Sequence, residues 1–245
     1  MIVWLGMYDM APLQAANDRF WQAIRARLGD GPEALRRDIH TWEVWQSPDL
    51  FLSQTCGLPF RARLHDKVRL VGTPDYGLPG CPPGHYNSAL VVRADDPRER
   101  LADFAHARIA FNDGLSQSGW GAPHAHFAAA GVEIGPRLET GAHANSAEAV
   151  AEGRADIASL DALTWTLLQE HRPELAQGLR ELERTAPTPV LPYITAPTRD
   201  PAPLFDAIAG AIGDLSDADR GLLHLKGLVR IPPETYRAVP IPPAP

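Results

Sequence analysis

Strand-like and helix-like segments alternate along most of this chain, and this alternation restricts the fold more than any other feature of the sequence. The run IVWLGMY (2–8) predicts a buried strand. Pro12 is a favoured first-turn residue, and it opens a segment of helical periodicity that Gly29 ends. Such alternation is typical of mostly parallel sheets covered by helices on both faces. Further strands or extended segments are expected at 49–57, 67–72, 86–94, 107–112, 137–141, 155–161, 179–185 and 189–197, and helices at 119–131, 162–171, 202–213 and 216–226.

The ends of these predicted strands are the first places to look for a ligand site. In sheets of this kind, ligands collect at the carboxyl ends of strands, in the turns that lead into the next helix. Applied to this chain, the rule selects residues 8–9, 54–56, 116–119, His143 and Asp161.

The stretch FNDGLSQSGWG (111–121) contains the most informative of these turns, the SQSG loop (residues 116–119). A helix N-terminus presents about four unpaired N–H groups and a partial positive charge near half a unit, which together favour an anion. Ser116 and Ser118 add hydroxyl donors, and Gly119 keeps side chains away from the backbone. The loop has no P-loop lysine, so it predicts a small tetrahedral oxyanion site and not nucleotide hydrolysis. The alternative is a serine cap beside glycines that serve packing.

Charge and composition exclude several other classes. The formal net charge of −7 argues against a broad nucleic-acid surface but permits an anion site made by local dipoles. No apolar run approaches the roughly 20 residues that a membrane span requires. The start, MIVWLGMYDM, lacks the basic segment of a secretion signal, which predicts a cytoplasmic protein; removal of a leader would instead mean a periplasmic one. Cys56 and Cys81 suit neither a disulfide framework nor a four-thiolate zinc site, and their redox state is left open.

Blocks spread over nearly the whole chain resemble the PhnD-like family, the phosphate/phosphite/phosphonate-binding proteins of ABC transporters. SQSGW matches the family's serine-x-serine-glycine anion loop. The resemblance implies the type 2 periplasmic-binding-protein fold, an α/β fold with two lobes joined by two crossing strands and a ligand cleft between the lobes. Lobe one is expected at 1–88 plus 192–245, and lobe two at 89–191. The matching blocks are MYDM (7–10), LSQTCGLP (52–59), VGTPDYGLPGC (71–81), YNSALVVRADDP (86–97), SQSGW (116–120), TGAH (140–143) and EGRADIASLDALTW (152–165).

The resemblance also implies which residues bind the ligand, with a phenol from lobe one and hydroxyls, an amide and an imidazole from lobe two. Asp161 could instead cap the helix that begins at Ala162, and Tyr8 could be a packing residue. If Asp161 touches the ligand, its carboxylate favours oxyanions that carry a proton, such as phosphate, phosphite or a phosphonate, over sulfate. The residues expected to bind are Tyr8, Thr55, Ser116, Gln117, Ser118, Gly119, His143 and Asp161.

We therefore expect a non-catalytic solute-binding protein that needs no metal or other cofactor. Its partners are expected to be a small oxyanion and either an ABC transporter permease or a signalling protein. Leu163 stands where aminophosphonate-binding members carry an acid, which disfavours an amine-bearing phosphonate. Two alternatives remain open: a cytoplasmic sensor, and a biosynthetic enzyme on the same fold with Cys56 as nucleophile and His143 or His85 as base.

Overall fold

The computed structural model describes residues 1–245 as two compact units. The sequence analysis grouped the last residues with lobe one, whereas here Pro240–Pro245 belong to the second unit. Short paired strands, β4 (His85–Tyr86) and β10 (Thr188–Pro189), lie where the chain first leaves and first re-enters unit 1. Unit 1 comprises Met1–His85 and Pro189–Val239, and unit 2 comprises Tyr86–Thr188 and Pro240–Pro245.

Unit 1 is built on a five-stranded mixed sheet. β1 and β2 are parallel, but β11 is antiparallel to both of its neighbours, β2 and β3, and β12 is antiparallel to β3. The expectation of a mostly parallel sheet is wrong here because the returning chain enters the middle of the sheet as β11 and runs against its neighbours. The strand order is β1 (Ile2–Trp4), β2 (Leu50–Gln54), β11 (Tyr193–Thr195), β3 (Arg69–Asp75) and β12 (Gly227–Val229).

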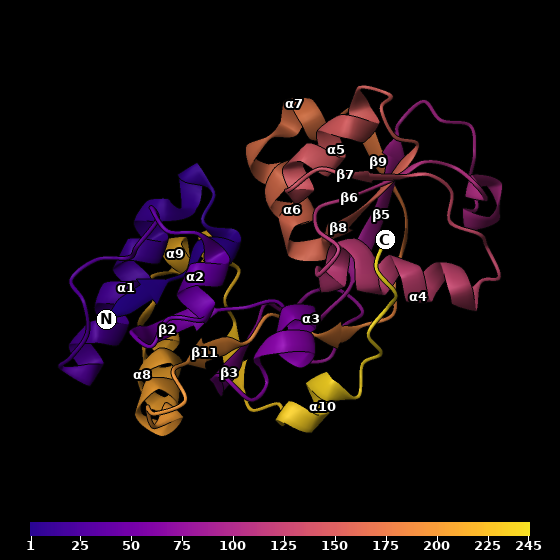
Figure 1. Ribbon diagram of the computed structural model, residues 1–245. Helices are drawn as coiled ribbons and strands as arrows, with labels where there is room; N and C mark the ends of the chain where they lie inside the picture. Colours follow the sequence, from indigo (N-terminus) through magenta and orange to yellow (C-terminus); the bar gives the residue numbers. More distant parts are fainter. The chain divides into compact units, whose positions relative to one another are not determined.

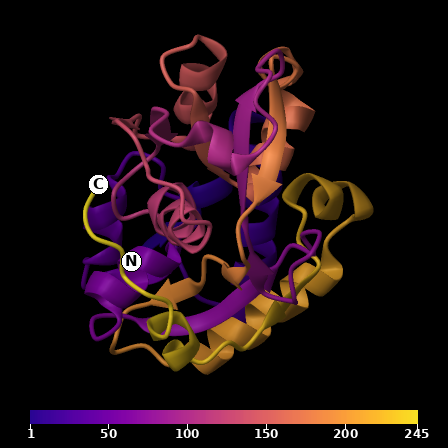
Figure 2. The same cartoon turned by 90° about the vertical axis from the view of Figure 1, so that its right-hand side faces the viewer.

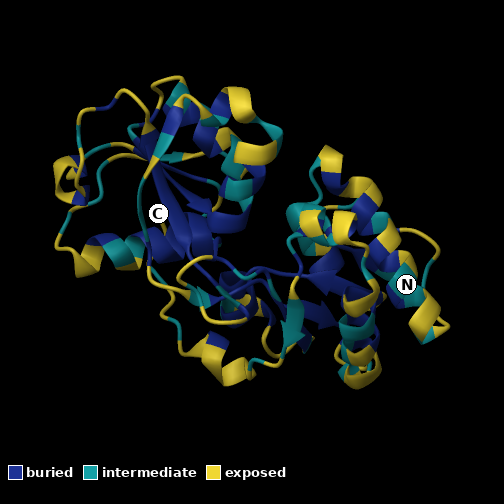
Figure 3. Cartoon of the chain, turned by 180° about the vertical axis from the view of Figure 1, so that it is seen from behind, coloured by how far each residue is buried: buried dark blue, intermediate teal, exposed yellow.

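Apolar residues on both faces of this sheet are covered by helices, so its strands are largely buried, except for the edge strand β12, which is partly exposed (Figure 3). Neighbouring residues of a strand point to opposite faces. In β2, Phe51 meets Trp21 of α1 edge-on at 5.9 Å between ring centroids, while Leu50 packs with Trp45 on the other face. The helical elements are α1 (Gln14–Leu28), α2 (Thr41–Trp45), α3 (Gly57–Pro59), α8 (Pro201–Asp214), α9 (Asp217–Leu223), α10 (Pro233–Arg237) and the turns η1 (Gly6–Tyr8), η2 (Ala11–Leu13) and η3 (Phe60–Leu64).

The first strand is shorter than predicted. β1 ends at Trp4, and the next residues form the turn η1, which includes Tyr8. A Cβ at Gly6 would lie 2.3 Å from the indole of Trp4, so the chain folds tightly over that ring and cannot continue as a strand. The helix that follows ends as predicted at Gly29, whose φ of 65° is left-handed.

Unit 2 is built on a second five-stranded sheet (Figure 1). β7, β6 and β8 are mutually parallel, whereas β5 is antiparallel to β8 and β9. Figure 2 shows β5, in purple, beside β9, in orange. The strand order is β7 (Arg137–Glu139), β6 (Ile109–Phe111), β8 (Ile157–Asp161), β5 (Ser88–Arg93) and β9 (Leu179–Arg184).

Each parallel strand of unit 2 is followed by a helical segment, and those after β6 and β8 were expected from the sequence. β6 leads to the turn η5 (Gln117–Gly121), which continues as α4 (Ala122–Ala129). β7 leads to α5 (His143–Ala151), and β8 leads directly to α6 (Ala162–His171). The remaining helical elements are α7 (Pro173–Ala176) and the turn η4 (Leu101–Phe104). None of the helices in either unit combines the length and the apolar character needed to cross a membrane.

A charged network closes the edge of the unit 2 core. The guanidinium of Arg98 binds Asp96 at 2.6 Å and Asp156 at 3.0 Å, and it lies 4.1 Å from the ring centroid of Phe104. Asp96 is almost fully buried. Its hydrogen bonds with Arg98 lower the pKa of Asp96 to about 2.

Replacement of Asp96 by Asn should therefore lower the free energy of unfolding by about 2 kcal/mol at pH 7. The pKa of Asp96 in the folded chain is below the ordinary value of 3.8, so its contribution is present above pH 3.8 and is lost as the pH falls towards 2. Urea unfolding of both proteins between pH 7 and pH 2 measures this. Equal stabilities at pH 7 would contradict it.

Candidate functional site

Three helical segments begin at one edge of the unit 2 sheet, the edge where the adjacent parallel strands β7, β6 and β8 end. Their first N–H groups carry the partial positive charges of helix N-termini. The SQSG loop connects β6 to the first of these segments, and His143 is the first residue of α5. The sheet therefore brings together two of the places that the sequence analysis selected.

Two strand hydroxyls hold the SQSG loop to the sheet. The backbone oxygen of Ser118 accepts hydrogen bonds from Ser88 Oγ at 2.9 Å and from Ser159 Oγ at 2.7 Å. Ser88 lies in β5 and Ser159 in β8, and the antiparallel register, which pairs Leu90 with Ser159, puts both hydroxyls on the same face. Neither serine was expected from the sequence, in which the only signal is a serine next to apolar residues, at the first position of β5 and in the middle of β8.

Inside the loop, Ser116 acts as a helix cap. Its Oγ accepts the N–H of Gly119 at 3.0 Å, and its backbone oxygen accepts the N–H groups of Trp120 and Gly121. Gln117 is buried, and its carbonyl accepts the N–H of the first residue of α4. The amide of Gly119 thus donates within the loop in this structure.

The glycine at position 119 makes room for a side chain. A Cβ there would lie 1.8 Å from Oδ1 of Asn112, a contact that no real atom pair makes. The Oδ1 atom is buried and has no hydrogen-bond partner. The bare backbone of Gly119 was expected to serve a ligand; in the structure it accommodates Asn112, and its role in ligand binding stays a prediction.

His143 joins the loop to the start of α5. Its Nε2 lies 2.9 Å from Oγ of Ser118, and its Nδ1 is buried without a hydrogen-bond partner. Burial of the ring lowers the pKa of His143 to about 4, so the imidazole is neutral at pH 7. No side chain caps the N-terminus of α5, which leaves its first amides without a cap acceptor. An anion is a suitable partner for such a set of groups.

Asp161 takes the capping role that the sequence analysis gave as its alternative. Its side chain is buried, and Oδ1 accepts the N–H groups of Leu163 at 2.8 Å and Thr164 at 3.0 Å at the start of α6. The expected role of Asp161 in ligand binding stays a prediction.

The remaining two predicted residues, Tyr8 and Thr55, belong to unit 1. Tyr8 is partly exposed in η1, and its ring meets Tyr76 edge-on at 5.4 Å. Thr55 is buried directly after β2, and its N–H donates to the backbone oxygen of Pro192 at 3.0 Å. Their roles in ligand binding also stay predictions.

Neither cysteine is part of a disulfide. Cys56 is buried ahead of α3, and Cys81 lies in the turn after β3. His85, one of the bases considered for Cys56, has its Nδ1 at 3.1 Å from the backbone oxygen of Pro83 in its own turn. No group of three or more His, Cys, Asp or Glu residues is arranged to hold a metal ion.

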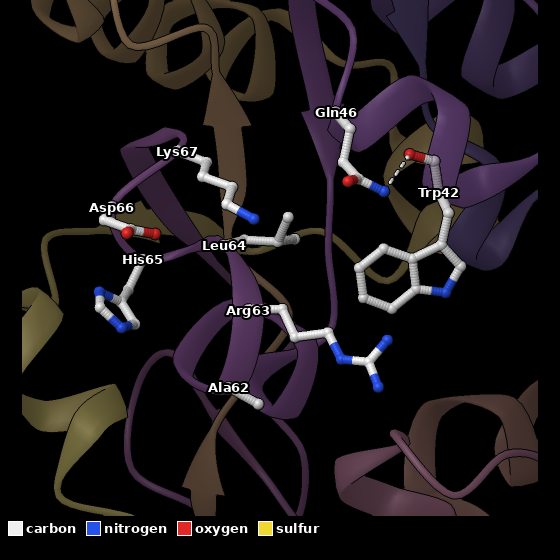
Figure 4. A pocket seen from close by; sticks show the side chains of 8 residues that line it. All are labelled: Trp42, Gln46, Ala62, Arg63, Leu64, His65, Asp66 and Lys67. Carbon is white, nitrogen blue, oxygen red and sulfur yellow. Dashed lines mark hydrogen bonds between the residues drawn. The ribbon is translucent and has the colours of Figure 1, made fainter.

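A pocket of about 460 Å³ lies elsewhere in unit 1, between α2 and the end of η3 (Figure 4). Trp42 forms one wall, with the guanidinium of Arg63 5.4 Å from its ring centroid. Gln46 donates to the backbone oxygen of Trp42. The other lining residues include exposed side chains such as Lys67. The pocket contains none of the predicted ligand-binding residues.

Substitution of Gly119 by Ala should lower the free energy of unfolding by about 1–3 kcal/mol, because the new methyl group forces Asn112 from its position. The double variant Asn112→Ala/Gly119→Ala should recover part of this loss. Gly213→Ala is the matched control, since nothing lies within 4 Å of a Cβ at that helical position. Thermal unfolding measures the stability of all three variants. A Gly119→Ala variant as stable as the parent protein would argue against the clash with Asn112.

Titration of His143 by NMR should give a midpoint near 4. In the unfolded chain the pKa of His143 has its ordinary value of 6.5. The contribution of the neutral ring to the free energy of unfolding is therefore fully present above pH 6.5 and falls as the pH drops towards 4. The loss should amount to at most about 3 kcal/mol, and His143→Gln should abolish it. His65→Gln, at an exposed position, is the control. A midpoint of His143 near 6.5 would exclude the buried neutral ring.

The comparisons with known proteins identify the family and the fold of this chain. The family model for the periplasmic substrate-binding proteins of ABC phosphonate transporters matches residues 53–235, well over half of the chain. Among proteins with curated descriptions, none matches the sequence significantly.

Similar solved structures share the fold at low sequence identity. PhnD1 from Prochlorococcus marinus, in complex with methylphosphonate, is 16% identical with a TM-score of 0.76, over 96% of this chain and 93% of that one. XAC2383 from Xanthomonas citri, bound to ATP, is 16% identical with a TM-score of 0.69, over 98% of this chain and 94% of that one. The binding protein component of an ABC phosphonate transporter, PA3383 from Pseudomonas aeruginosa, is 15% identical with a TM-score of 0.66, over 93% and 80%.

These findings confirm the expected periplasmic-binding-protein fold and the family that the sequence blocks indicated. Nothing in them supports an enzyme with Cys56 as nucleophile or a cytoplasmic sensor. The chain belongs to the family of periplasmic substrate-binding proteins of ABC phosphonate transporters, a family of non-catalytic solute-binding proteins.

Proposed function

We propose that this protein binds a phosphonate, or the closely related phosphate or phosphite, at the SQSG loop and delivers it to an ABC transporter permease. The observation that carries the proposal is the hydrogen bond between Oγ of Ser118 and Nε2 of His143, which lie 2.9 Å apart where two helical segments begin. Their N-termini direct partial positive charge at the same place. A tetrahedral oxyanion has several oxygens that can accept hydrogen bonds from such a group.

The donors of this site are neutral. Ser116 and Ser118 contribute hydroxyls, and the His143 imidazole, uncharged at pH 7, contributes one N–H and one lone pair. The uncapped first amides of α5 add backbone donors. Binding by oriented neutral dipoles depends on hydrogen-bond geometry and less on the total charge of the ligand, which suits a choice among oxyanions of similar size.

Discrimination against sulfate is the finer part of the proposal. Oδ1 of Asn112 is buried without a partner next to Gly119, and Asp161 carries a carboxylate at the end of β8. Hydrogen-bond acceptors near the site favour an oxyanion that still carries a proton. Phosphonates, phosphate and phosphite retain a proton near neutral pH, whereas sulfate does not.

Isothermal titration with methylphosphonate, phosphate, phosphite and sulfate tests the proposal. At least one of the first three should bind and should stabilise the fold by about 2.7 kcal/mol at a concentration of 100 times its Kd, while sulfate binds more weakly. Ser118→Ala should reduce affinity roughly tenfold or more, because it removes a ligand donor and the partner of His143.

The matched control is Ser47→Ala, which removes a hydroxyl in unit 1 that accepts the N–H of Asp49 in a surface turn. Circular dichroism checks that both variants are folded. Absence of binding by all four anions to the parent protein would refute the proposal. Equal affinities of the Ser118→Ala and Ser47→Ala variants would show that the SQSG loop is not the binding site.

A further inference from the structure

The last residues of the chain pack against the segment that carries the SQSG loop. The indole Nε1–H of Trp120, the residue after Gly119, donates to the backbone oxygen of Pro243 at 2.8 Å. On the other side of the loop, a Cβ at Gly114 would lie 3.0 Å from the ring of Pro245. The tail (Pro240–Pro245) therefore contacts the chain both before and after the loop, and Figure 1 shows this yellow end of the chain near α4.

The tail has the composition of a preformed ligand. Four of its six residues are proline, in the sequence PIPPAP. Proline fixes φ, and a proline-rich segment such as this favours the extended polyproline helix, which has no internal hydrogen bonds and loses little conformational entropy on docking. The carbonyl groups of such a segment are left for donors outside it. The large apolar side chain of Ile241 is 58% exposed, so burial of that side chain does not hold the tail in place.

Trp120 is the residue that binds the tail, through its indole N–H. Its side chain is fully buried, with Phe111 and His124 at 5.3 and 5.7 Å between ring centroids and the guanidinium of Arg137 5.3 Å from its own. A buried indole N–H requires an acceptor, and a carbonyl of the tail supplies it. Domains that recognise polyproline helices also use aromatic residues to contact them.

Trp120 also belongs to the hydrogen-bonding frame of the loop. Its backbone N–H donates to the backbone oxygen of Ser116 at 3.0 Å, so the position of the indole and the position of Ser116 are coupled. The sheet holds the loop from one side through Ser118. The tail holds it through Trp120.

We propose that the tail is an internal polyproline ligand of Trp120 that keeps the SQSG loop in its oxyanion-binding geometry. Trp120 and Pro243 are positioning residues in this arrangement, since they act on the ligand through Ser116 and Gly119. The effect on affinity rests on the function proposed above, whereas the docking of the tail and its effect on the loop do not.

The first experiment needs no oxyanion. The chain is ended after Val239, and Trp120→Phe assigns the indole N–H signal in the NMR spectrum. Truncation should shift that signal and should accelerate hydrogen exchange at the amides of Gly119 and Trp120 about tenfold, relative to the amide of Ala158 in β8. An unshifted indole signal would refute the docking, and unchanged exchange at the loop would refute the positioning.

The second experiment measures affinity for methylphosphonate. Truncation and Trp120→Phe should each weaken binding about tenfold, and millimolar VPIPPAP peptide added to the truncated chain should restore it. Ile241→Ala, which keeps every backbone carbonyl, is the control and should bind like the parent. Faster loop exchange with unchanged affinity would overturn the role in binding.

The two experiments separate this proposal from the function itself. If the full-length chain binds no oxyanion at all, the proposed function fails, and the exchange measurement still decides whether the tail orders the loop. If the full-length chain binds methylphosphonate and the truncated chain binds it equally well, the function stands and the positioning role of the tail fails.

Discussion

The candidate site depends on one buried carbonyl and its two donors. The backbone oxygen of Ser118 has two lone pairs, and hydroxyls from two adjacent strands occupy both. A buried backbone oxygen without such partners is costly, so these two bonds hold the loop where the hydroxyl of Ser118 meets His143. The antiparallel pairing of β5 with β8 determines where those two hydroxyls lie. β5, which lies just after the chain enters unit 2, thus helps to position the loop.

The elements that sequence reasoning located best are those with strong local signals. α6 (Ala162–His171) has the predicted bounds, because Asp161 caps its first turn and a buried strand precedes it. Two other elements had no such signal. β12 (Gly227–Val229) is too short to show periodicity and is a strand only because β3 pairs with it, and α10 (Pro233–Arg237) falls in a proline-rich stretch for which no element was predicted. The sheets are mixed and not mostly parallel, which follows from pairings between distant segments.

The same distinction applies to the site. The SQSG loop and His143 were expected from helix-terminus chemistry and from the family resemblance, and the structure places them in contact. Ser88, Ser159 and Asn112 were not expected, because each matters only through a partner that lies 7 to 41 residues away in the chain. A single sequence shows the polarity of such residues but not the register that pairs them.

The position of the C-terminus has a practical consequence for handling this protein. Pro245 lies against Gly114, at the entrance to the segment that carries the candidate site. A purification tag, a fluorescent fusion or a surface linker attached after Pro245 would start at this point and compete with the tail for its contacts. Attachment at Met1, which is 58% exposed, avoids this interference, so the choice of terminus belongs among the design decisions for any biosensor made from this chain.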